Sequence, residues 1–341
     1  MAKITIVGTG LIGTSLALAL RQTQNRDLEL VGTDANSSAR AGAQKSKAFD
    51  KVENRLSLAV RDAGVVVLAT PVLAMQEVME VIADDLTEGC VLTDVGSSKK
   101  VVMEWAESNL PMHVEFVGGH PMAGREKSGP ENADGNLFKD KVYCVIPSKK
   151  ASSRAVSEVS NLAEAIGARP FFIGVDEHDS FVAAVSHLPF LLSVALVGCT
   201  SKSPNWEDIA QLAATGYEDI SRLAAGDPIM HRDICLSNPE PIVAWIDAFI
   251  KELYEVRQLL DADPGPNSES VHEVFEKAFV ARTLWKDGAI TQAREARQSP
   301  VEIPSFTESV GDFFGGSMGR KLFQGQKKMF GGDKDDRPMG R

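Results

Sequence analysis

The chain is poor in cysteine and in positive charge. Its four cysteines are far apart and form no C-x-x-C pair, which argues against both a zinc ribbon and a disulfide framework. Basic residues number 36 against 47 acidic ones, which gives a formal net charge of −11. This charge disfavours long-range attraction of nucleic acid or of an anionic membrane, so we expect neither as a partner.

Long apolar runs are also scarce. The most apolar stretch, residues 188–197, contains Pro189 and Ser193 and is far shorter than the roughly 20 residues that cross a bilayer. Near the N-terminus, Lys3 precedes an apolar run, but glycines interrupt it and no small-residue cleavage site follows. We therefore expect no transmembrane segment and no signal peptide, and we expect a cytoplasmic protein.

The pattern of apolar residues divides the 341-residue chain into two parts. Up to residue 147, short β-branched runs alternate with helical patterns, which is typical of an α/β fold with a doubly wound, Rossmann-type parallel sheet. We expect strands at 4–7, 28–33, 65–69, 91–95, 114–117, 142–146 and 169–173. After Asp176 the apolar residues recur at helical spacing, so the second part is predicted to be all-helical, with its first helix at 181–200.

These patterns give three expected regions. Residues 1–174 form a dinucleotide-binding Rossmann domain, and residues 175–297 form a helical substrate domain. Residues 298–341 are rich in Gly, Lys, Arg and Asp and show no sustained period, which predicts a flexible tail.

A glycine-rich turn directly follows the first expected strand. Gly8 permits a tight turn, Gly10 lets the backbone approach a pyrophosphate, and Gly13 allows a helix and a strand to pack closely. The helix begins at Leu11 and Ile12, so its N-terminus would face the phosphates. The alternative is a glycine-rich turn that binds nothing, but the placement between a strand and a helix favours a dinucleotide.

Two further strand ends belong to the predicted cofactor site. Asp34 ends the second strand, where a carboxylate accepts hydrogen bonds from ribose hydroxyls and repels a 2′-phosphate, which favours NAD. Asp34 could instead cap the next helix, and the nearby Arg40 leaves NADP possible. Thr70 and Pro71 follow another strand at the same edge of the sheet, although Pro71 could simply start a helix.

Polar residues at 94–99 and 118–124 should face the nicotinamide from the same edge. A dehydrogenase needs a base that takes the hydroxyl proton as hydride leaves, and a neutral histidine suits this role. His120 is the best candidate, because the diglycine before it and the proline after it allow close approach to a ligand. The alternative is a structural histidine satisfied by loop carbonyls.

Several motifs in order resemble those of the prephenate/arogenate dehydrogenase family over residues 3–297. They are Asp-Val-Gly-Ser-Ser-Lys at 94–99, Gly-Gly-His-Pro-Met-Ala-Gly at 118–124, His178-Asp179, Ser186-His187-Leu188-Pro189, and Asp219-Ile220-Ser221-Arg222 followed by Asp227-Pro228. This family oxidises prephenate or arogenate with loss of carbon dioxide, giving 4-hydroxyphenylpyruvate or tyrosine in tyrosine biosynthesis. The resemblance implies an NAD-dependent oxidoreductase with a Rossmann domain and an all-helical dimerisation domain, and hence a homodimer.

The resemblance also implies roles for individual residues. His120 would take the proton from the ring 4-hydroxyl, and Ser97 would orient that hydroxyl and His120; Ser97 could also be a helix N-cap. Arg222 would bind a substrate carboxylate, with Asp219 holding its guanidinium, although such a pair could equally be a surface ion pair on a helix.

Four more residues are weaker candidates. Arg125 and Glu126 follow the catalytic loop, and in this family that neighbourhood contacts the substrate side chain. Their charges favour opposite substrates, prephenate and arogenate respectively, so they do not decide between the two, and either could be a solvated loop charge. His187 is a site residue or a packed structural histidine, and His231 could reach a neighbouring subunit's site.

A metal is not expected. The acidic residues and histidine at 176–179 could suggest a metal site, but consecutive residues do not easily point at one ion, and a helix N-terminus favours acidic residues anyway.

Two rival functions remain open. A β-hydroxyacid dehydrogenase would explain residues 8–34 but not His120 together with Arg222. A non-catalytic NAD-sensing protein would not need Ser97, His120 and Arg222 together.

Overall fold

The structure is a computed structural model that describes residues 2–25, 27–125 and 127–291. Residues 1–250 form one compact unit, and a second begins at Lys251. The expected tail, residues 298–341, lies outside the described residues. The expected domain limits at 174 and 297 stay predictions.

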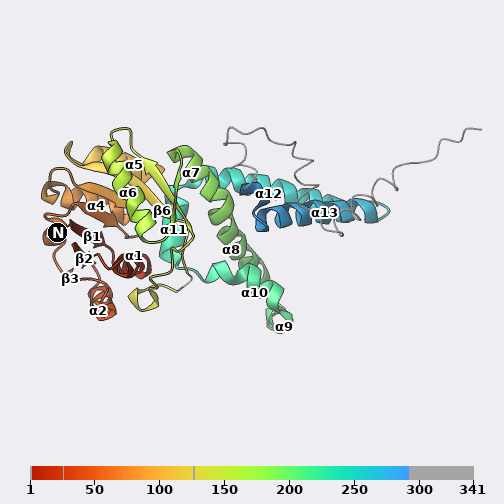
Figure 1. The fold of residues 1–341 in the computed structure, drawn as a ribbon. Helices are drawn as coiled ribbons and strands as arrows, with labels where there is room; N and C mark the ends of the chain where they lie inside the picture. Colours follow the sequence, from red (N-terminus) through yellow and green to blue (C-terminus); the bar gives the residue numbers. More distant parts are fainter. Residues whose placement is uncertain (1, 26, 126, 292–341) are drawn as a thin grey trace, which may run out of the picture. The chain divides into compact units, whose positions relative to one another are not determined.

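An eight-stranded sheet in the order β3-β2-β1-β4-β5-β6-β7-β8 forms the centre of the first unit (Figure 1). The strands are β1 (Ala2–Val7), β2 (Leu28–Thr33), β3 (Lys51–Glu53), β4 (Val65–Leu68), β5 (Val91–Asp94), β6 (Glu115–Pro121), β7 (Val142–Pro147) and β8 (Arg169–Phe172). The parallel register pairs Val7 with both Thr33 and Leu68, and Leu68 with Asp94. The residues that follow these strands therefore meet at one edge, as the sequence predicts.

The sheet is mostly parallel rather than wholly parallel, which corrects the expectation. β7 runs antiparallel to β6, and β8 is parallel to β7. Parallel neighbours need a crossover connection, usually a helix, whereas antiparallel neighbours can be joined at one edge by a loop. Between β6 and β7 the described chain has only a short 3-10 turn, η2 (Pro130–Asn132), so β7 starts at the edge where β6 ends. The three-residue strand β3 was not expected either.

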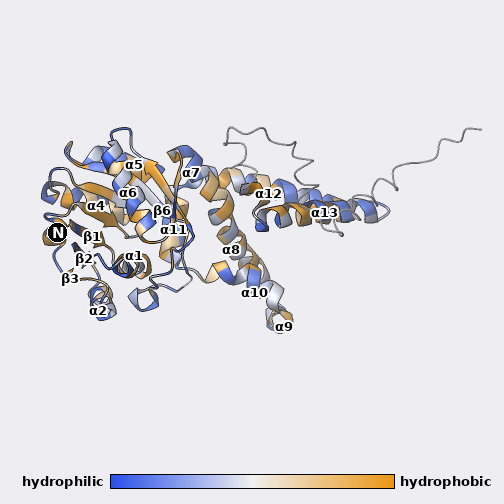
Figure 2. Cartoon of the chain, in the orientation of Figure 1, coloured by the Kyte–Doolittle hydropathy of each residue, from blue (hydrophilic) through white to orange (hydrophobic). Residues whose placement is uncertain are grey.

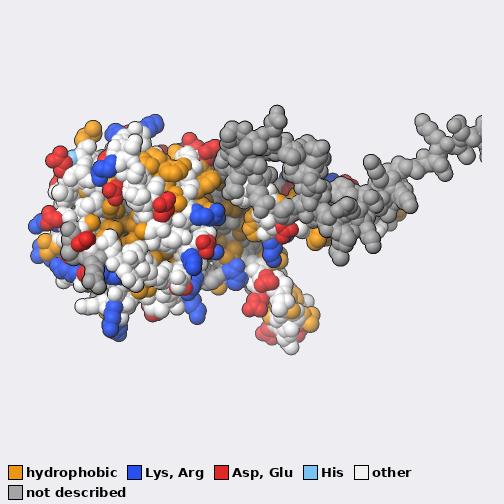
Figure 3. All heavy atoms as spheres, viewed as in Figure 1, with side chains coloured by type: hydrophobic (Ala, Val, Ile, Leu, Met, Phe, Trp, Pro, Cys, Tyr) orange, Lys and Arg blue, Asp and Glu red, His pale blue; other side chains and the backbone are white. Residues whose placement is uncertain are grey.

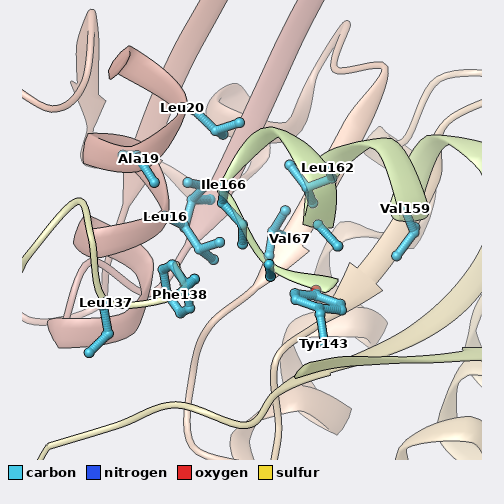
Figure 4. Close-up of a cluster of buried hydrophobic side chains, with 14 of the residues drawn as sticks. Leu16, Ala19, Leu20, Val67, Leu137, Phe138, Tyr143, Val159, Leu162 and Ile166 are labelled. Carbon is cyan, nitrogen blue, oxygen red and sulfur yellow. The ribbon is translucent and has the colours of Figure 1, made fainter. Parts of the chain in front are cut away.

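Helices cover both faces of the sheet, which makes the fold doubly wound. They are α1 (Leu11–Gln22), α2 (Ser37–Ser46), α3 (Leu56–Val60), α4 (Ala74–Ile82), the 3-10 turn η1 (Ala83–Asp85), α5 (Lys100–Asn109) and α6 (Ser153–Ala165). On one face, Leu16 of α1 and Leu162 of α6 pack on Val67 and Tyr143 of the sheet (Figure 4). On the other face, α3, α4 and α5 cover a second buried cluster. The central strand β4, which is covered on both faces, is accordingly a continuous apolar run, Val-Val-Val-Leu.

The chain beyond β8 is helical throughout its described part, in agreement with the prediction. The elements are α7 (Val175–Val182), the π turn η3 (Ala183–His187), α8 (Leu188–Thr200), α9 (Trp206–Leu212), α10 (Thr215–Ser221), the 3-10 turn η4 (Arg222–Ala225), α11 (Pro228–Ser237), α12 (Pro239–Leu260) and α13 (Ser268–Lys286).

The first of these helices starts earlier than expected. From Val175 to Thr200 the chain is helical without a break, through Pro189 and Ser193. Proline has no N–H to donate. In the π turn ahead of Pro189, Leu188 N donates to Ala183 O, five residues back, and the helix continues through the proline.

This continuous helix is long and apolar enough to cross a membrane by length and composition, and 28% of its most apolar window is buried. The expectation that Pro189 and Ser193 interrupt this apolar stretch was wrong, because the helix continues through both. Length and composition alone do not test the expectation of no transmembrane segment. His178, Asp179 and His187 lie in its first half and are buried against the rest of the unit. The expectation that no membrane is bound stays a prediction.

Candidate active site

The glycine turn after β1 shows which glycines the fold itself requires. Gly8 has a φ of +102°, and a Cβ there would lie 2.4 Å from Ala69 O. A Cβ on Gly13 would lie 1.9 Å from Gly8 O. A Cβ on Gly10, in contrast, would meet nothing within 4 Å. Packing explains Gly8 and Gly13, while the open space at Gly10 fits a ligand that approaches the backbone.

Asp34 joins the end of β2 to this turn. Its carboxylate accepts hydrogen bonds from Thr9 N at 2.7 Å and from Asn36 N at 2.8 Å. Asn36, and not Asp34, caps helix α2 by accepting from Ser38 N, so the capping alternative is wrong for Asp34. Arg40 lies beside it and donates to Asp34 O at 2.6 Å.

Thr70 gives a further sign of a ligand at this edge. Its hydroxyl oxygen is buried and makes no hydrogen bond with any described residue. Buried hydroxyls are normally paired, so a bound ligand would satisfy this one. A dinucleotide fits this edge of the sheet. Its pyrophosphate fits the open space at Gly10 and the start of α1 at Leu11 and Ile12. The hydroxyl of Thr70, next to Pro71, and the carboxylate of Asp34 fit the pyrophosphate and the ribose.

His120 lies near the end of β6 and is 7% exposed. The glycine before it is required by packing, because a Cβ on Gly119 would lie 2.5 Å from both Asp94 O and Tyr143 Oη. The diglycine therefore lets β6 fit between β5 and Tyr143. This packing fixes the backbone that carries the histidine.

A chain of hydrogen bonds runs from His120 into helix α7. His120 Nδ1 lies 2.9 Å from His178 Nε2, and His178 Nδ1 lies 2.7 Å from Asp179 Oδ1. The Asp179 carboxylate also accepts from Lys99 N at 2.8 Å and from Lys100 N at 2.9 Å, the first amides of α5. Burial alone would raise the pKa of Asp179, but the hydrogen bonds from His178 and from these two amides lower it below its usual value.

Ser97 is not a helix cap. The N-terminus of α5 makes no side-chain cap of its own, because Asp179 supplies the cap from 80 residues further along the chain. Ser97 is half-buried, and its hydroxyl makes no hydrogen bond with any described residue. The capping alternative is therefore wrong, and the hydroxyl is available to a ligand.

A buried ion pair lies next to His120. Lys99 Nζ and Asp94 Oδ2 are in direct contact, and both side chains are fully buried. Asp94 also accepts hydrogen bonds from Gly96 N at 2.8 Å and from Gly119 N at 3.2 Å. The pair fixes the end of β5 against β6.

The surroundings of His120 favour its neutral form. Burial lowers the pKa of His120 well below its usual value, and three neighbouring groups that can carry positive charge lower it further. These groups are His178, Lys99 and His187. A histidine held neutral at physiological pH is able to accept a proton.

His187 is fixed from the junction of α11 and α12. Asn238 Nδ2 donates to Asp179 O at 2.8 Å and lies 3.3 Å from His187 Nδ1. His187 Nε2 is buried and has no partner among the described residues. Burial lowers the pKa of His187 to about 4. Next to it, Ser98 and Ser237 share a hydrogen bond of 2.6 Å between their hydroxyls, so the loop after β5 is tied to α11.

Arg222 begins the turn η4, and Ser193 of α8 fixes that turn. The Ser193 hydroxyl is buried, donates to Ile220 O and accepts from Ala224 N at 3.2 Å, one contact on each side of Arg222. Both Arg222 and Asp219 are exposed. The expected contact between them stays a prediction.

The remaining candidates lie elsewhere. Arg125 is bonded to Asp134 in its own loop at 2.5 Å. Glu126 lies outside the described residues. His231 stacks on Phe190 with ring centroids 4.2 Å apart and planes 4° apart, and burial lowers its pKa. No cluster of three His, Cys, Asp or Glu side chains in the described part of the chain is placed to hold a metal ion.

Sequence reasoning gave no role to the partners of His120. His178 and Asp179 were noticed as a motif and as a possible metal run, and Lys99 and Asn238 were given no role. These residues are recognisable as polar side chains that the fold buries. This burial becomes apparent only when α7 and α11 are packed against the loop after β5.

Two protein families match this chain. Residues 16–171 match the prephenate dehydrogenase nucleotide-binding domain, and residues 175–277 match the prephenate dehydrogenase dimerization domain. The chain is 33% identical to the prephenate dehydrogenase of Bacillus subtilis over 77% of its own length and 71% of that protein.

Solved structures agree with these matches. One is prephenate dehydrogenase from A. aeolicus in complex with hydroxyphenyl propionate and NAD+, with a TM-score of 0.76, 30% identity and coverage of 83% of this chain and 98% of that one. Another is Synechocystis arogenate dehydrogenase, with a TM-score of 0.69, 26% identity and coverage of 83% and 99%.

Proposed function

Because the chain belongs to the prephenate dehydrogenase family, we propose that His120 and the side chains around it carry out that family's reaction in this protein. The reaction is the NAD-dependent oxidative decarboxylation of prephenate or arogenate, in tyrosine biosynthesis. The observation that carries the proposal is the state of His120: it is buried, its Nδ1 is bonded to His178, and its Nε2 makes no hydrogen bond with any described residue.

His120 acts as the general base. Nε2 takes the proton of the ring 4-hydroxyl while hydride leaves the carbon that bears it, and Ser97 orients that hydroxyl. NAD, when bound, accepts the hydride. The resulting ring ketone is conjugated to the carbon that carries the carboxylate, so carbon dioxide departs and the ring becomes aromatic. The protein mainly positions the substrate and keeps His120 neutral, because aromatisation supplies the driving force.

The cofactor is held by the edge described above. Gly8, Gly10 and Gly13 with the first turn of α1 would face the pyrophosphate, and Thr70 and Pro71 would border it. Asp34 would accept from the ribose hydroxyls, which supports NAD. Arg40 is bonded to the carbonyl of Asp34, so its charge stays beside that ribose and keeps use of NADP possible.

Residues from the helical part and from the loop after β6 would hold the substrate. Arg222 would bind a carboxylate, with Asp219 beside its guanidinium, and the buried Nε2 of His187 would bind a second polar group. Arg125 and Glu126 would border the substrate side chain, and Arg125 would first have to leave Asp134. An arginine that binds a carboxylate equally tightly in the ground state and in the transition state adds binding without adding rate, so we expect Arg222 to affect KM more than kcat.

The protein is proposed to be a cytoplasmic homodimer. Helices α8, α11 and α12 leave large apolar side chains exposed, and Figure 2 shows α8 as a mainly hydrophobic helix. Examples are Val194, Leu236 and Trp245. These lie in the region that matches the dimerization domain, so a second copy accounts for them without a membrane. Figure 3 shows acidic and basic side chains interspersed over one face of the sheet unit, which supports small-molecule partners over nucleic acid.

A steady-state comparison tests this proposal. Initial rates of reduction should be measured for prephenate and arogenate, each with NAD and with NADP. We expect turnover with NAD and at least one of the two substrates. A protein that binds NAD but turns over neither substrate would support the NAD-sensing alternative instead.

A further inference from the structure

In the hydrogen-bond chain from Asp179 through His178 to His120, the carboxylate of Asp179 determines which ring nitrogens donate and which accept. Asp179 accepts from Lys99 N and Lys100 N, and backbone amides can only donate. A protonated carboxyl would place a third donor among them. Asp179 is therefore an ionised acceptor, and the ring nitrogen that faces it, His178 Nδ1, must carry a hydrogen.

The position of the hydrogen on His178 also determines the position of the hydrogen on His120. A neutral imidazole has one donor nitrogen and one acceptor nitrogen. His178 is fully buried between His120 and Asp179. In the neutral form that carries its hydrogen on Nδ1, it presents an acceptor at Nε2, which lies 2.9 Å from His120 Nδ1. His120 must then carry its own hydrogen on Nδ1. Its Nε2 is left with a lone pair, which is the form that a general base needs.

The same hydrogen bonds also stabilise His120 after it has accepted a proton. When His120 has accepted a proton, its Nδ1–H still donates to His178, and the carboxylate of Asp179 stands at the far end of the two hydrogen bonds. Other charged or titratable groups also face His120: the cation of Lys99, which Asp94 neutralises, and His187. None of them is hydrogen-bonded to the His120 ring among the described residues, so Asp179 and His178 alone determine which nitrogen is free.

We propose that His178 and Asp179 are positioning residues that fix the His120 tautomer, so that Nε2 is always the nitrogen that accepts the substrate proton. This inference rests on the proposed role of His120 as the base. It assigns a catalytic purpose to a buried dyad that also joins the sheet to the helical part.

The cleanest test compares two substitutions of His178, because Asp179 also caps α5 and its loss would disturb the fold. In His178→Gln, the amide oxygen can accept from His120 while the amide nitrogen donates to Asp179. In His178→Leu, neither bond can form. We expect His178→Gln to retain kcat within about tenfold and His178→Leu to lose about 100-fold or more, within the range that general-base catalysis contributes. The affinity for NAD and the thermal stability serve as controls for folding.

A second measurement reads the tautomer without any turnover. Proton–nitrogen correlation NMR on protein labelled with 15N-histidine distinguishes the two neutral tautomers, and His120→Asn assigns the His120 signals. We expect the Nδ1–H form in the wild type and in His178→Gln, and an enriched Nε2–H form in His178→Leu. An Nε2–H tautomer in the wild type, or equal kcat losses in the two variants, would overturn the inference. Failure of the proposed function would look different, because the wild type itself would turn over neither substrate while its tautomer could still be read.

Discussion

The two ends of the proposed active site are built in opposite ways. The cofactor turn uses residues 8–36 of one strand-helix-strand unit and the neighbouring strand end, and most of its contacts involve backbone atoms. We use the name catalytic joint for Ser98, His120, Asp179, Asn238 and the side chains bonded to them. Apart from the neighbours His178 and Asp179, its bonded side chains lie 51 to 139 positions apart in the chain. A local spacing of glycines can specify the first, but only the complete fold can assemble the second.

The difference also affects what each region tolerates. In the glycine turn the constraint is steric, so an added methyl group either clashes with the backbone or meets nothing. In the joint the constraint is pairing, since removal of one buried polar group leaves its partner unsatisfied at a cost of about 1–3 kcal/mol. The predictions below use substitutions that separate these two kinds of constraint.

The largest effect is expected at the base. His120→Asn keeps a polar side chain but removes the proton acceptor, so kcat should fall by about 10²- to 10⁴-fold. The affinity for NAD should hardly change, because the cofactor turn shares no hydrogen bond with the joint among the described residues. Steady-state kinetics measures kcat, and calorimetry separately measures the affinity for NAD. A variant with most of its activity would remove His120 from the mechanism.

His187 should make stability depend on pH. Its pKa in the folded protein is about 4, below the ordinary value of 6.5, because the ring is buried. A depressed pKa means that the unfolded chain binds the proton first, so stability is complete above pH 6.5 and declines as the pH falls toward 4. The loss from this group is at most about 3 kcal/mol.

Urea unfolding at pH 7.5 and pH 4.5 measures this loss. In His187→Gln, which is neutral at both values, the difference between the two unfolding free energies should shrink by about 2.5 kcal/mol. The exposed His272 provides the matched control, and His272→Gln should leave that difference unchanged. An undiminished pH dependence in His187→Gln would mean that the His187 ring titrates normally.

The comparison of the two regions also shows how far the sequence could predict this protein. The strand positions and the glycine turn were predicted well, because β-branched runs and glycine spacing act locally. The direction of β7 was missed, since nothing in its composition shows that the connection before it lacks a crossover helix. Ser97 was the one cap of α5 that the sequence offered, as an alternative to its catalytic role, whereas the fold brings Asp179 there from 80 residues away.

The glycines of the turn offer a matched pair of substitutions. Gly8→Ala places a Cβ 2.4 Å from Ala69 O at a positive φ, so we expect a loss of about 2 kcal/mol of stability. Gly10→Ala meets nothing within 4 Å, so the stability should change by less than about 1 kcal/mol. The affinity of Gly10→Ala for NAD should nevertheless fall by about tenfold or more, since the added methyl group occupies space that the pyrophosphate needs. Thermal unfolding and calorimetry test both, and an unchanged affinity in Gly10→Ala would place the dinucleotide elsewhere.

The smallest effect is expected at the hydroxyl pair that ties the loop after β5 to α11. Ser98 and Ser237 are buried and 2.6 Å apart, and Ser237 also has Ile234 O as an acceptor at 3.3 Å. Because Ser237 keeps this second partner, Ser98→Ala should cost only about 1 kcal/mol. The double variant Ser98→Ala/Ser237→Ala should cost less than the two single variants added together, with a coupling of about 0.5–1.5 kcal/mol. Strict additivity in urea unfolding would show that the two hydroxyls do not depend on each other. The joint would then be held by the chain from Asp179 to His120 and by the hydrogen bonds of Asn238, so its stability and its catalytic role would rest on largely the same few hydrogen bonds.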